Sequence, residues 1–403
     1  MSTPAAPAGN RIPVTLVTGF LGSGKTTMIN AALRAPELAD TIVVVNEFGE
    51  VGLDHSLITK SNDTVVVLEN GCLCCTVRSD LVSTLNSLFH SRQAGEIPAF
   101  RHVIIETSGL AEPGPVLQAF LSEPTLDGLY RVASVVTLVD AVNWADTARE
   151  HDEAVRQVAL ADQIRITKID LAETGAERLI AELRRINPAA GIEPLDRAVS
   201  AIAALLTAEG FDAANPGGDP RSWLALAGYE NAHDDHVHDE HCGHDHDHDH
   251  GHHHHHEDHL AARGIESFVL MRETPLSRAE LQFLLDGIGQ NLGTGLLRVK
   301  GLVNVAEEPG RPAVIQGAQH LLHTMTWLDH WPDPDERTRV VFITQGIAKD
   351  SLKEVIELLD RMAARTFKAR ERARAKLEAD RAAEEAGNAG SSGPATDSQG
   401  DER

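Results

Sequence analysis

Two short motifs in the chain combine residue types and spacings that could do chemistry. The first is GFLGSGKT, which runs from Gly19 to Thr26. Its glycines let backbone amides close around phosphates without a Cβ in the way, Lys25 can reach the outer phosphates, and the Thr26 hydroxyl can bind Mg²⁺. The pattern therefore predicts a nucleoside triphosphate site. The predicted nucleotide-binding residues of this motif are Gly19, Gly22, Ser23, Gly24, Lys25, Thr26 and Thr27.

The second motif is GCLCC, which places Cys72, Cys74 and Cys75 within four positions of a chain that has four cysteines in all. Three thiolates suit a cation such as Zn²⁺, Co²⁺ or Cu⁺ and leave one coordination position open. A closed structural zinc site would need a fourth ligand, and a redox site usually shows Cys-x-x-Cys. The crowding predicts an exchangeable transition-metal site on these three residues.

Acidic residues follow two further segments that look like buried strands. In HVIIETSGLAEP, Glu106 stands where a strand ends, placed to hold the Mg²⁺ shell or orient the attacking water, and the amide of Gly109 can reach the γ-phosphate. We therefore expect Lys25, Glu106 and Gly109 to be the catalytic residues. The loop NEFGEVGLD could sense nucleotide. Candidate metal ligands besides the cysteines are Thr26, Glu47 and Asp54.

The segment RITKID, which we expect to follow a strand, carries Thr167, Lys168 and Asp170. It resembles the Asn-Lys-x-Asp guanine motif, in which the aspartate accepts hydrogen bonds from both donors of the guanine edge. Adenine offers no matching pair of donors. The motif favours GTP, with these three residues as base-recognition residues, and it leaves ATP as the alternative.

These residues need a scaffold, and the sequence predicts an α/β fold for it. Continuous apolar runs such as IPVTLVTG and HVIIETSG are typical of strands in a buried parallel sheet, and helical stretches lie between several of them. This alternation predicts a P-loop domain with a doubly wound, mostly parallel sheet, followed by a small α+β domain. Parallel strands gather ligands at their carboxyl ends, which is where the cysteines and Glu106 would lie.

The predicted organisation has five parts. A capping box of Ser277 and Glu280 is predicted at the start of the main helix of the second domain. The parts are a disordered N-terminus (1–11), the P-loop domain (12–206), a flexible His/Asp-rich linker (207–263), the α+β domain (264–362), and a charged helical tail that becomes disordered (363–403).

The composition limits the partners. The net charge of −24 argues against a nucleic-acid surface, and no apolar stretch is long enough to suggest a membrane span or a signal peptide. Thiols kept in a cluster favour a reducing compartment, so we expect a cytoplasmic protein. Fourteen of the 21 histidines lie between His233 and His259, interleaved with nine acidic residues, which predicts an accessory metal-binding tract.

Taken together, Gly19–Thr26, NEFGEVGLD, GCLCC, ETSGLAEP and TKID resemble the CobW family of metallochaperone GTPases, over about residues 12 to 360. The resemblance implies GTP with Mg²⁺, a metal on Cys72, Cys74 and Cys75, and delivery of that metal to a client protein or into cobalamin synthesis. Thr167 departs from the Asn of the guanine motif.

The leading hypothesis is a GTPase that couples hydrolysis to transfer of a metal, with zinc favoured and cobalt next. The alternatives are a His-rich metal buffer and an ATP-dependent small-molecule kinase, which would leave the cysteines unexplained. The expected partners are the transition-metal ion, a metal-dependent client protein and, as a further option, a second copy in a nucleotide- or metal-dependent dimer.

Overall fold

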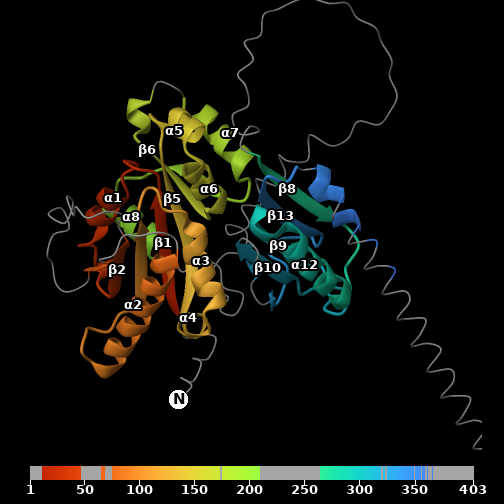
Figure 1. Cartoon of the computed structure of the whole chain (residues 1–403), viewed down its shortest axis with the longest axis horizontal. Helices are drawn as coiled ribbons and strands as arrows, with labels where there is room; N and C mark the ends of the chain where they lie inside the picture. The colour runs from red at the N-terminus through yellow and green to blue at the C-terminus, as the bar shows by residue number, and fades with distance from the viewer. Residues whose placement is uncertain are drawn as a thin grey trace, which may run out of the picture.

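The computed structural model shows two lobes that lie side by side (Figure 1). The first contains residues up to 208 and the second begins at Gly264. The described residues are 11–46, 65–68, 75–172, 175–208, 264–318, 321–322, 325–348, 350–354, 356–358, 361 and 365.

A seven-stranded sheet in the order β3-β2-β4-β1-β5-β6-β7 forms the centre of the first lobe, and all of its strand pairs are parallel. The continuous apolar runs read as buried strands are therefore confirmed. The strands are β1 (Ile12–Gly19), β2 (Thr41–Asn46), β3 (Val65–Leu68), β4 (His102–Thr107), β5 (Tyr130–Asp140), β6 (Gln163–Thr167) and β7 (Gly191–Pro194).

Helices cover both faces of this sheet. One face packs against apolar residues of α2, α3 and α4, such as Leu85 and Phe120, and the other packs against α1 and α8 through Met28 and Leu206. The helical elements are α1 (Lys25–Ala32), η2 (Pro36–Leu38), α2 (Cys75–Ala94), α3 (Pro113–Ser122), α4 (Pro124–Leu129), α5 (Trp144–Glu150), α6 (Asp152–Leu160), η3 (Ile169–Leu171), α7 (Ala176–Ile186) and α8 (Val199–Leu206).

The second lobe is an antiparallel sheet with a long helix on one face. Its path is β11-β10-β9-β13-β8, and β12 pairs with β10. The predicted capping box is confirmed, because the Ser277 side chain accepts from the Glu280 amide and Glu280 accepts from the Ser277 amide. The elements are β8 (Ile265–Arg272), α12 (Arg278–Leu292), η4 (Gly293–Gly295), β9 (Leu296–Val303), β10 (Ala313–Ala318), β11 (Leu321–Leu322), β12 (Thr326–Trp327) and β13 (Thr338–Gln345).

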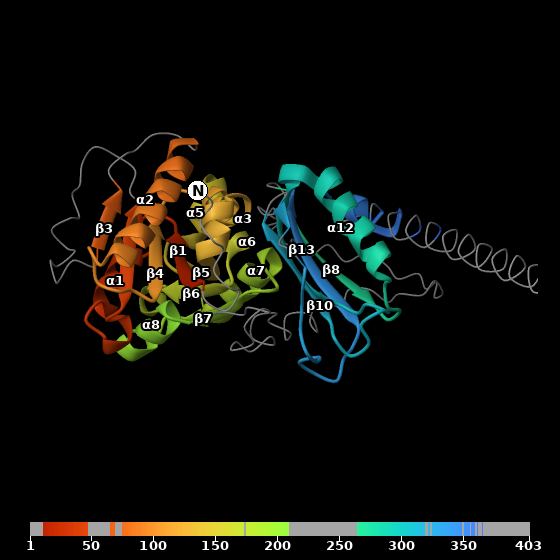
Figure 2. The same ribbon diagram turned by 90° about the horizontal axis from the view of Figure 1, so that it is seen from below.

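The two faces of this second sheet bury different surfaces. Along β13, Val340 and Phe342 pack in a core with α12, whereas Val341 and Ile343 join a core that includes residues of α6 and α7 in the first lobe. Successive residues of a strand point to opposite faces, which explains the alternation. Figure 2 shows α6 and α7 facing the second sheet, with α12 on its outer side. The two lobes therefore share one continuous apolar core.

Buried charges lie at the same junction. The Asp162 carboxylate, just after α6, is 2.7 Å from Arg298 and 2.7 Å from Lys300, both on β9. Its other oxygen accepts from the Val135 amide at 2.9 Å. Burial alone would raise the pKa of Asp162, but the two cations and the hydrogen bonds outweigh that effect and lower it to about 2. The carboxylate is therefore held ionised between the two lobes.

The strand before the TKID motif differs in its limits from our expectation. We placed RITKID after a strand, but Arg165, Ile166 and Thr167 belong to β6, which ends at Thr167. The β-branched residues Ile164 and Ile166 are both buried, so this short segment has the apolar content of a central strand. In the described part of the chain, no helix is long and apolar enough to cross a membrane.

Candidate functional site

The phosphate-binding motif forms a glycine-dependent loop between β1 and α1. Gly19, Gly22 and Gly24 have φ values of 138°, 72° and 95°, a region that residues with a Cβ rarely adopt. A Cβ on Gly19 would also lie 2.4 Å from the Leu138 carbonyl oxygen. Because Gly24 is the left-handed cap of α1, the loop ends at a helix N-terminus, where backbone amides favour anions.

Lys25 is the first residue of α1 and lies within this loop. Its ammonium donates to the carbonyls of Gly19 at 2.7 Å and Phe20 at 3.3 Å. Burial lowers the pKa of Lys25, and the nearby Glu106 carboxylate opposes that shift. The side chain is only 8% exposed, so its charge acts where little water screens it. The lysine is thus placed beside the loop that the sequence predicts to hold phosphates.

The next residue, Thr26, meets the end of β4. Its hydroxyl donates to Glu106 Oε1 at 2.6 Å, and Glu106 is buried. The register of β1 on β4 pairs Val17 with Glu106, near the carboxyl ends of both strands. The Glu106 carboxylate and the Thr26 hydroxyl that donates to it therefore lie at the carboxyl edge of the sheet. A hydroxyl and a carboxylate in contact are oxygen donors of the kind that Mg²⁺ prefers. The residues present therefore fit the predicted magnesium ion, with Thr26 and Glu106 as the residues that would hold it.

The loop that follows β4 lies against the phosphate-binding loop. A Cβ on Gly109 would be 2.6 Å from the backbone nitrogen of Leu21, so a larger residue at position 109 would collide with that loop. The loop is closed by a hydrogen bond from the Ala111 amide to the Ser108 carbonyl at 3.0 Å. The structure thus brings Gly109 next to the loop that bears Lys25 and Thr26.

The start of the TKID motif is tied to the same place. The Thr167 hydroxyl donates to the Ser23 carbonyl of the phosphate-binding loop at 3.0 Å. Lys168 has φ 55° and ψ 27°, and it is the only non-glycine residue with positive φ in the described ranges. Its ammonium lies 2.7 Å from Asp140 Oδ2. The threonine that departs from the guanine motif therefore joins two loops of the site through its hydroxyl.

Asp140 ends β5 and was not among the predicted site residues. It is buried, and besides Lys168 it accepts from the Asn143 side chain at 2.7 Å and the Val142 amide at 3.0 Å. Burial would raise its pKa, but these three donors together lower it. The sequence signal was present, since VVTLVD ends a buried run in an acid, as HVIIE does at Glu106.

Asp170 stands apart from this group. It lies on η3 and is half-exposed, and its Oδ1 accepts from Arg197 at 2.8 Å. An exposed carboxylate three residues after the end of β6 is accessible to a ligand that lies along the edge of the sheet. A small pocket opens beside the phosphate-binding loop, and it is lined by Phe20, Ser23, Asp140 and Trp144, among others.

The remaining predicted metal ligands cannot be placed. Cys72, Cys74, Glu47 and Asp54 lie outside the described residues, as does the tract from His233 to His259. Cys75 is the first residue of α2, which fixes the position of its backbone only. Within the described ranges, no group of three His, Cys, Asp or Glu side chains could hold a metal ion. The cysteine site stays a prediction.

The parallel sheet, the glycine-rich loop that ends in Lys25 and Thr26, and the TKID loop beside it define the chain as a P-loop GTPase. Residues 13–193 match the model of the CobW/HypB/UreG nucleotide-binding domain, and residues 265–359 match the cobalamin synthesis protein CobW C-terminal domain. The chain therefore belongs to the CobW/HypB/UreG family, in the branch that carries the CobW C-terminal domain, as its sequence motifs suggested.

Individual relatives agree with this assignment. The zinc chaperone YjiA of Escherichia coli strain K12 is 30% identical over 345 residues, which cover 85% of this chain and 97% of that protein. The zinc-regulated GTPase metalloprotein activator 1 of Schizosaccharomyces pombe is 33% identical over 178 residues, 42% of each chain. The crystal structure of Zn(II)-bound YjiA shares the fold, with a TM-score of 0.57 and 24% identity over 87% of this chain and 99% of that one.

Proposed function

We propose that this protein is a cytoplasmic metallochaperone that binds zinc on Cys72, Cys74 and Cys75 and couples GTP hydrolysis to its transfer to a client protein. The relatives named as zinc chaperones and zinc-regulated activators support zinc over cobalt as the cargo. The histidine tract from His233 to His259 would serve as an accessory store, because neutral imidazoles bind the same ions.

The observation that carries this proposal is the order of strands at the carboxyl edge of the first sheet. Cys72, the first cysteine of the motif, comes four residues after β3 ends at Leu68, and β3 is separated from β1 only by β2 and β4. Neighbouring strands lie about 4.8 Å apart, so β3 and β1 are separated by roughly 14 Å. The end of β4, where Glu106 lies, is about 10 Å from β3 on the same measure. A metal site on the cysteines that follow β3 would therefore lie at the same edge of the sheet as the nucleotide site, close enough for the two to be coupled.

The nucleotide site supplies the chemistry of hydrolysis in this proposal. Lys25 leaves the Gly19 carbonyl to meet the outer phosphates, and the amide of Gly109 approaches the γ-phosphate from the opposite loop. Thr26 and Glu106 would hold Mg²⁺, which would neutralise charge on the phosphates when bound. Glu106 also lies where it can orient the attacking water. These groups are preorganised donors and charges in a poorly hydrated site, where they act most strongly.

Asp170→Asn is expected to lower affinity for guanine nucleotides about 10- to 100-fold, because hydrogen bonds to a charged acceptor contribute about 1.5–3 kcal/mol. The amide donates where the carboxylate accepted, so affinity for xanthine nucleotides should rise in the same variant. Asp196→Asn is the matched control, since Asp196 is an exposed neighbour whose side chain only accepts from the Ala198 amide. Equilibrium binding of labelled nucleotides measures both. Unchanged guanine affinity would remove Asp170 from base recognition.

The test of the coupling is a competitive zinc titration with a chelating probe, with a non-hydrolysable GTP analogue and again with GDP. We expect zinc to bind about 5- to 150-fold more tightly in the GTP state, the usual range for linked sites. By the same linkage, zinc must raise affinity for the GTP analogue by an equal factor. Cys72→Ser, Cys74→Ser and Cys75→Ser should each abolish the difference, whereas Cys242→Ser, the remaining cysteine, should preserve it.

Equal zinc affinities in the two nucleotide states would leave hydrolysis nothing to drive. In that case the chaperone proposal fails and the histidine-rich buffer takes its place. Loss of the coupling in Cys242→Ser alone would instead move the metal site to the linker. Either result is independent of whether the protein hydrolyses GTP.

A further inference from the structure

Two adjacent residues of α6 bind the loop that carries Gly109, and one of them also binds the second lobe. Gln157 is buried, and its amide nitrogen donates to the Gly109 carbonyl at 3.0 Å and to the Ala111 carbonyl at 2.9 Å. The backbone carbonyl of Gln157 accepts from the Thr137 hydroxyl on β5 at 2.9 Å, which anchors this part of the helix to the sheet. Both donors of one side-chain amide are therefore used on a single loop.

These bonds fix the orientation of the loop backbone. Each peptide unit is planar, so holding the carbonyls of Gly109 and Ala111 also fixes the planes that contain the amides of Leu110 and Glu112. The loop meets the phosphate-binding loop at Gly109 on its other side. A small displacement of reacting groups can lower a rate greatly, because catalytic donors act only in the right geometry. Gln157 therefore holds in place a loop that lies against the phosphate-binding loop.

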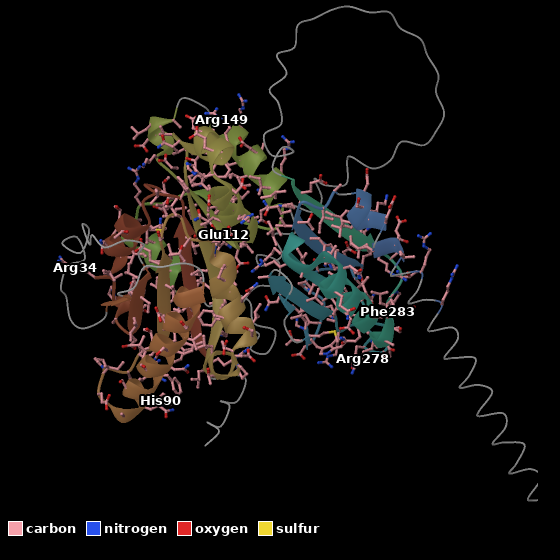
Figure 3. The ribbon with its side chains drawn as sticks, viewed as in Figure 1. Arg34, His90, Glu112, Arg149, Arg278 and Phe283 are labelled. Atoms are coloured by element: carbon pink, nitrogen blue, oxygen red, sulfur yellow. The ribbon has the colours of Figure 1, made fainter. Side chains whose placement is uncertain are left out.

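Arg156 extends this contact to the second lobe. Its guanidinium pairs with Glu112, at the end of the same loop, and its Nε donates to Gln345 Oε1 at 2.7 Å. Figure 3 places Glu112 near the upper end of α3, toward the second lobe. Gln345 is the last residue of β13. One planar side chain thus joins the Gly109 loop to the C-terminal sheet.

The surrounding contacts make this link stiff. On α6, Val155 and Val158 belong to the same apolar core as Val341 and Ile343 of β13. Asp162, two residues after α6 ends, is held by cations of β9. The helix is held against the second lobe at its middle and just after its C-terminal end, so a displacement of the Gly109 loop must either break the contacts of Arg156 or move the second lobe.

We propose that Gln157 and Arg156 are positioning residues for GTP hydrolysis, and that Arg156 makes the hydrolysis rate depend on the C-terminal domain through Gln345. The proposal rests on the proposed role of Gly109 at the γ-phosphate. It adds the second lobe as an element that sets the geometry of the hydrolytic loop. Both residues act through the loop of residues 108–112.

The test uses the full chain and measures kcat and KM for GTP, with GDP affinity and urea unfolding in parallel. Gln157→Met, which keeps the size of the side chain but removes its donors, should lower kcat about tenfold while KM and GDP affinity change less than about twofold. Gln345→Leu, in the other domain, should lower kcat about threefold with the same pattern. Arg149→Ala on α5 is the control for loss of an exposed arginine and should leave kcat unchanged.

A double-mutant cycle decides the role of the second lobe. If Arg156 and Gln345 act as one link, Arg156→Ala with Gln345→Leu should have the same kcat as Arg156→Ala alone. Additive losses, or a fall in kcat that follows the loss of stability in urea, would overturn the link. Lys25→Ala in the same assay separates this proposal from the proposed nucleotide site. If Lys25→Ala loses activity and Gln157→Met does not, the positioning role of Gln157 is wrong and the nucleotide site is retained.

Discussion

Lys25→Ala is expected to lower kcat/KM for GTP hydrolysis about 100- to 1000-fold, the size of effect seen when one preorganised donor is removed from a site of developing charge. The Lys25 side chain is buried within the phosphate-binding loop, and its ammonium lies 2.7 Å from the Gly19 carbonyl. Alanine at this position would supply no positive charge to the phosphates. Single-turnover hydrolysis of GTP, followed by release of inorganic phosphate, measures the effect.

Lys353→Ala provides the matched control, because Lys353 is exposed in the described helical segment 350–354. Its kcat/KM should equal that of the unmodified chain. Gly19→Ala should resemble Lys25→Ala for a different reason, since its Cβ would meet the Leu138 carbonyl oxygen. A Lys25→Ala protein that hydrolyses GTP within threefold of the unmodified rate would show that the loop has another role.

Asp162→Ala is expected to destabilise the protein by about 3–5 kcal/mol, which corresponds to a change of more than 100-fold in the unfolding equilibrium. The substitution removes a carboxylate that lies 2.7 Å from both Arg298 and Lys300, and the Lys300 side chain is only 2% exposed. Urea unfolding followed by tryptophan fluorescence measures the change. The control is Asp329→Ala, because the Asp329 side chain is 80% exposed and its loss should cost less than about 0.5 kcal/mol.

The same carboxylate predicts a pH dependence with a definite sign. Its pKa is about 2 in the folded protein against 3.8 as the ordinary value, so between those values the unfolded chain binds more protons. The contribution of the group, about 2 kcal/mol, is therefore complete above about pH 4 and is lost as the pH falls toward 2. Asp162→Asn should show a smaller loss of stability over that range. An identical acid transition in the two proteins would contradict the role of the carboxylate.

The scaffold and the phosphate loop could be predicted because their signals are local. Runs such as IPVTLVTG and HVIIETSG specify buried parallel strands without reference to the rest of the chain, and the glycines of GFLGSGKT specify a loop shape. Parallel strands share one carboxyl edge, so the meeting of Thr26 and Glu106 followed from the order of elements. In each case a few neighbouring residues determine the outcome.

The contacts of α6 could not be predicted, because they depend on residues far away in the chain. Arg156 and Gln157 look like ordinary positions of an amphipathic helix, yet the partners of Arg156 are 44 and 189 positions away. The docking of the second sheet is similar. The continuous apolar run of residues 340–343 predicts a strand buried on both faces, but it does not say which surface covers each face. Only the assembled fold supplies that information.

The core shared by the two lobes has a consequence for the modularity of the gene. Residues 207–264 separate α8 from β8, so the order of elements along the chain suggests two independent domains joined by a spacer. Yet Val155 and Val158 on one side and Val341 and Ile343 on the other belong to one apolar core, and Asp162 pairs with cations of the second lobe. Recombination or truncation at the spacer would leave both products with exposed apolar surface and unbalanced charge. The two lobes must therefore evolve as a matched pair.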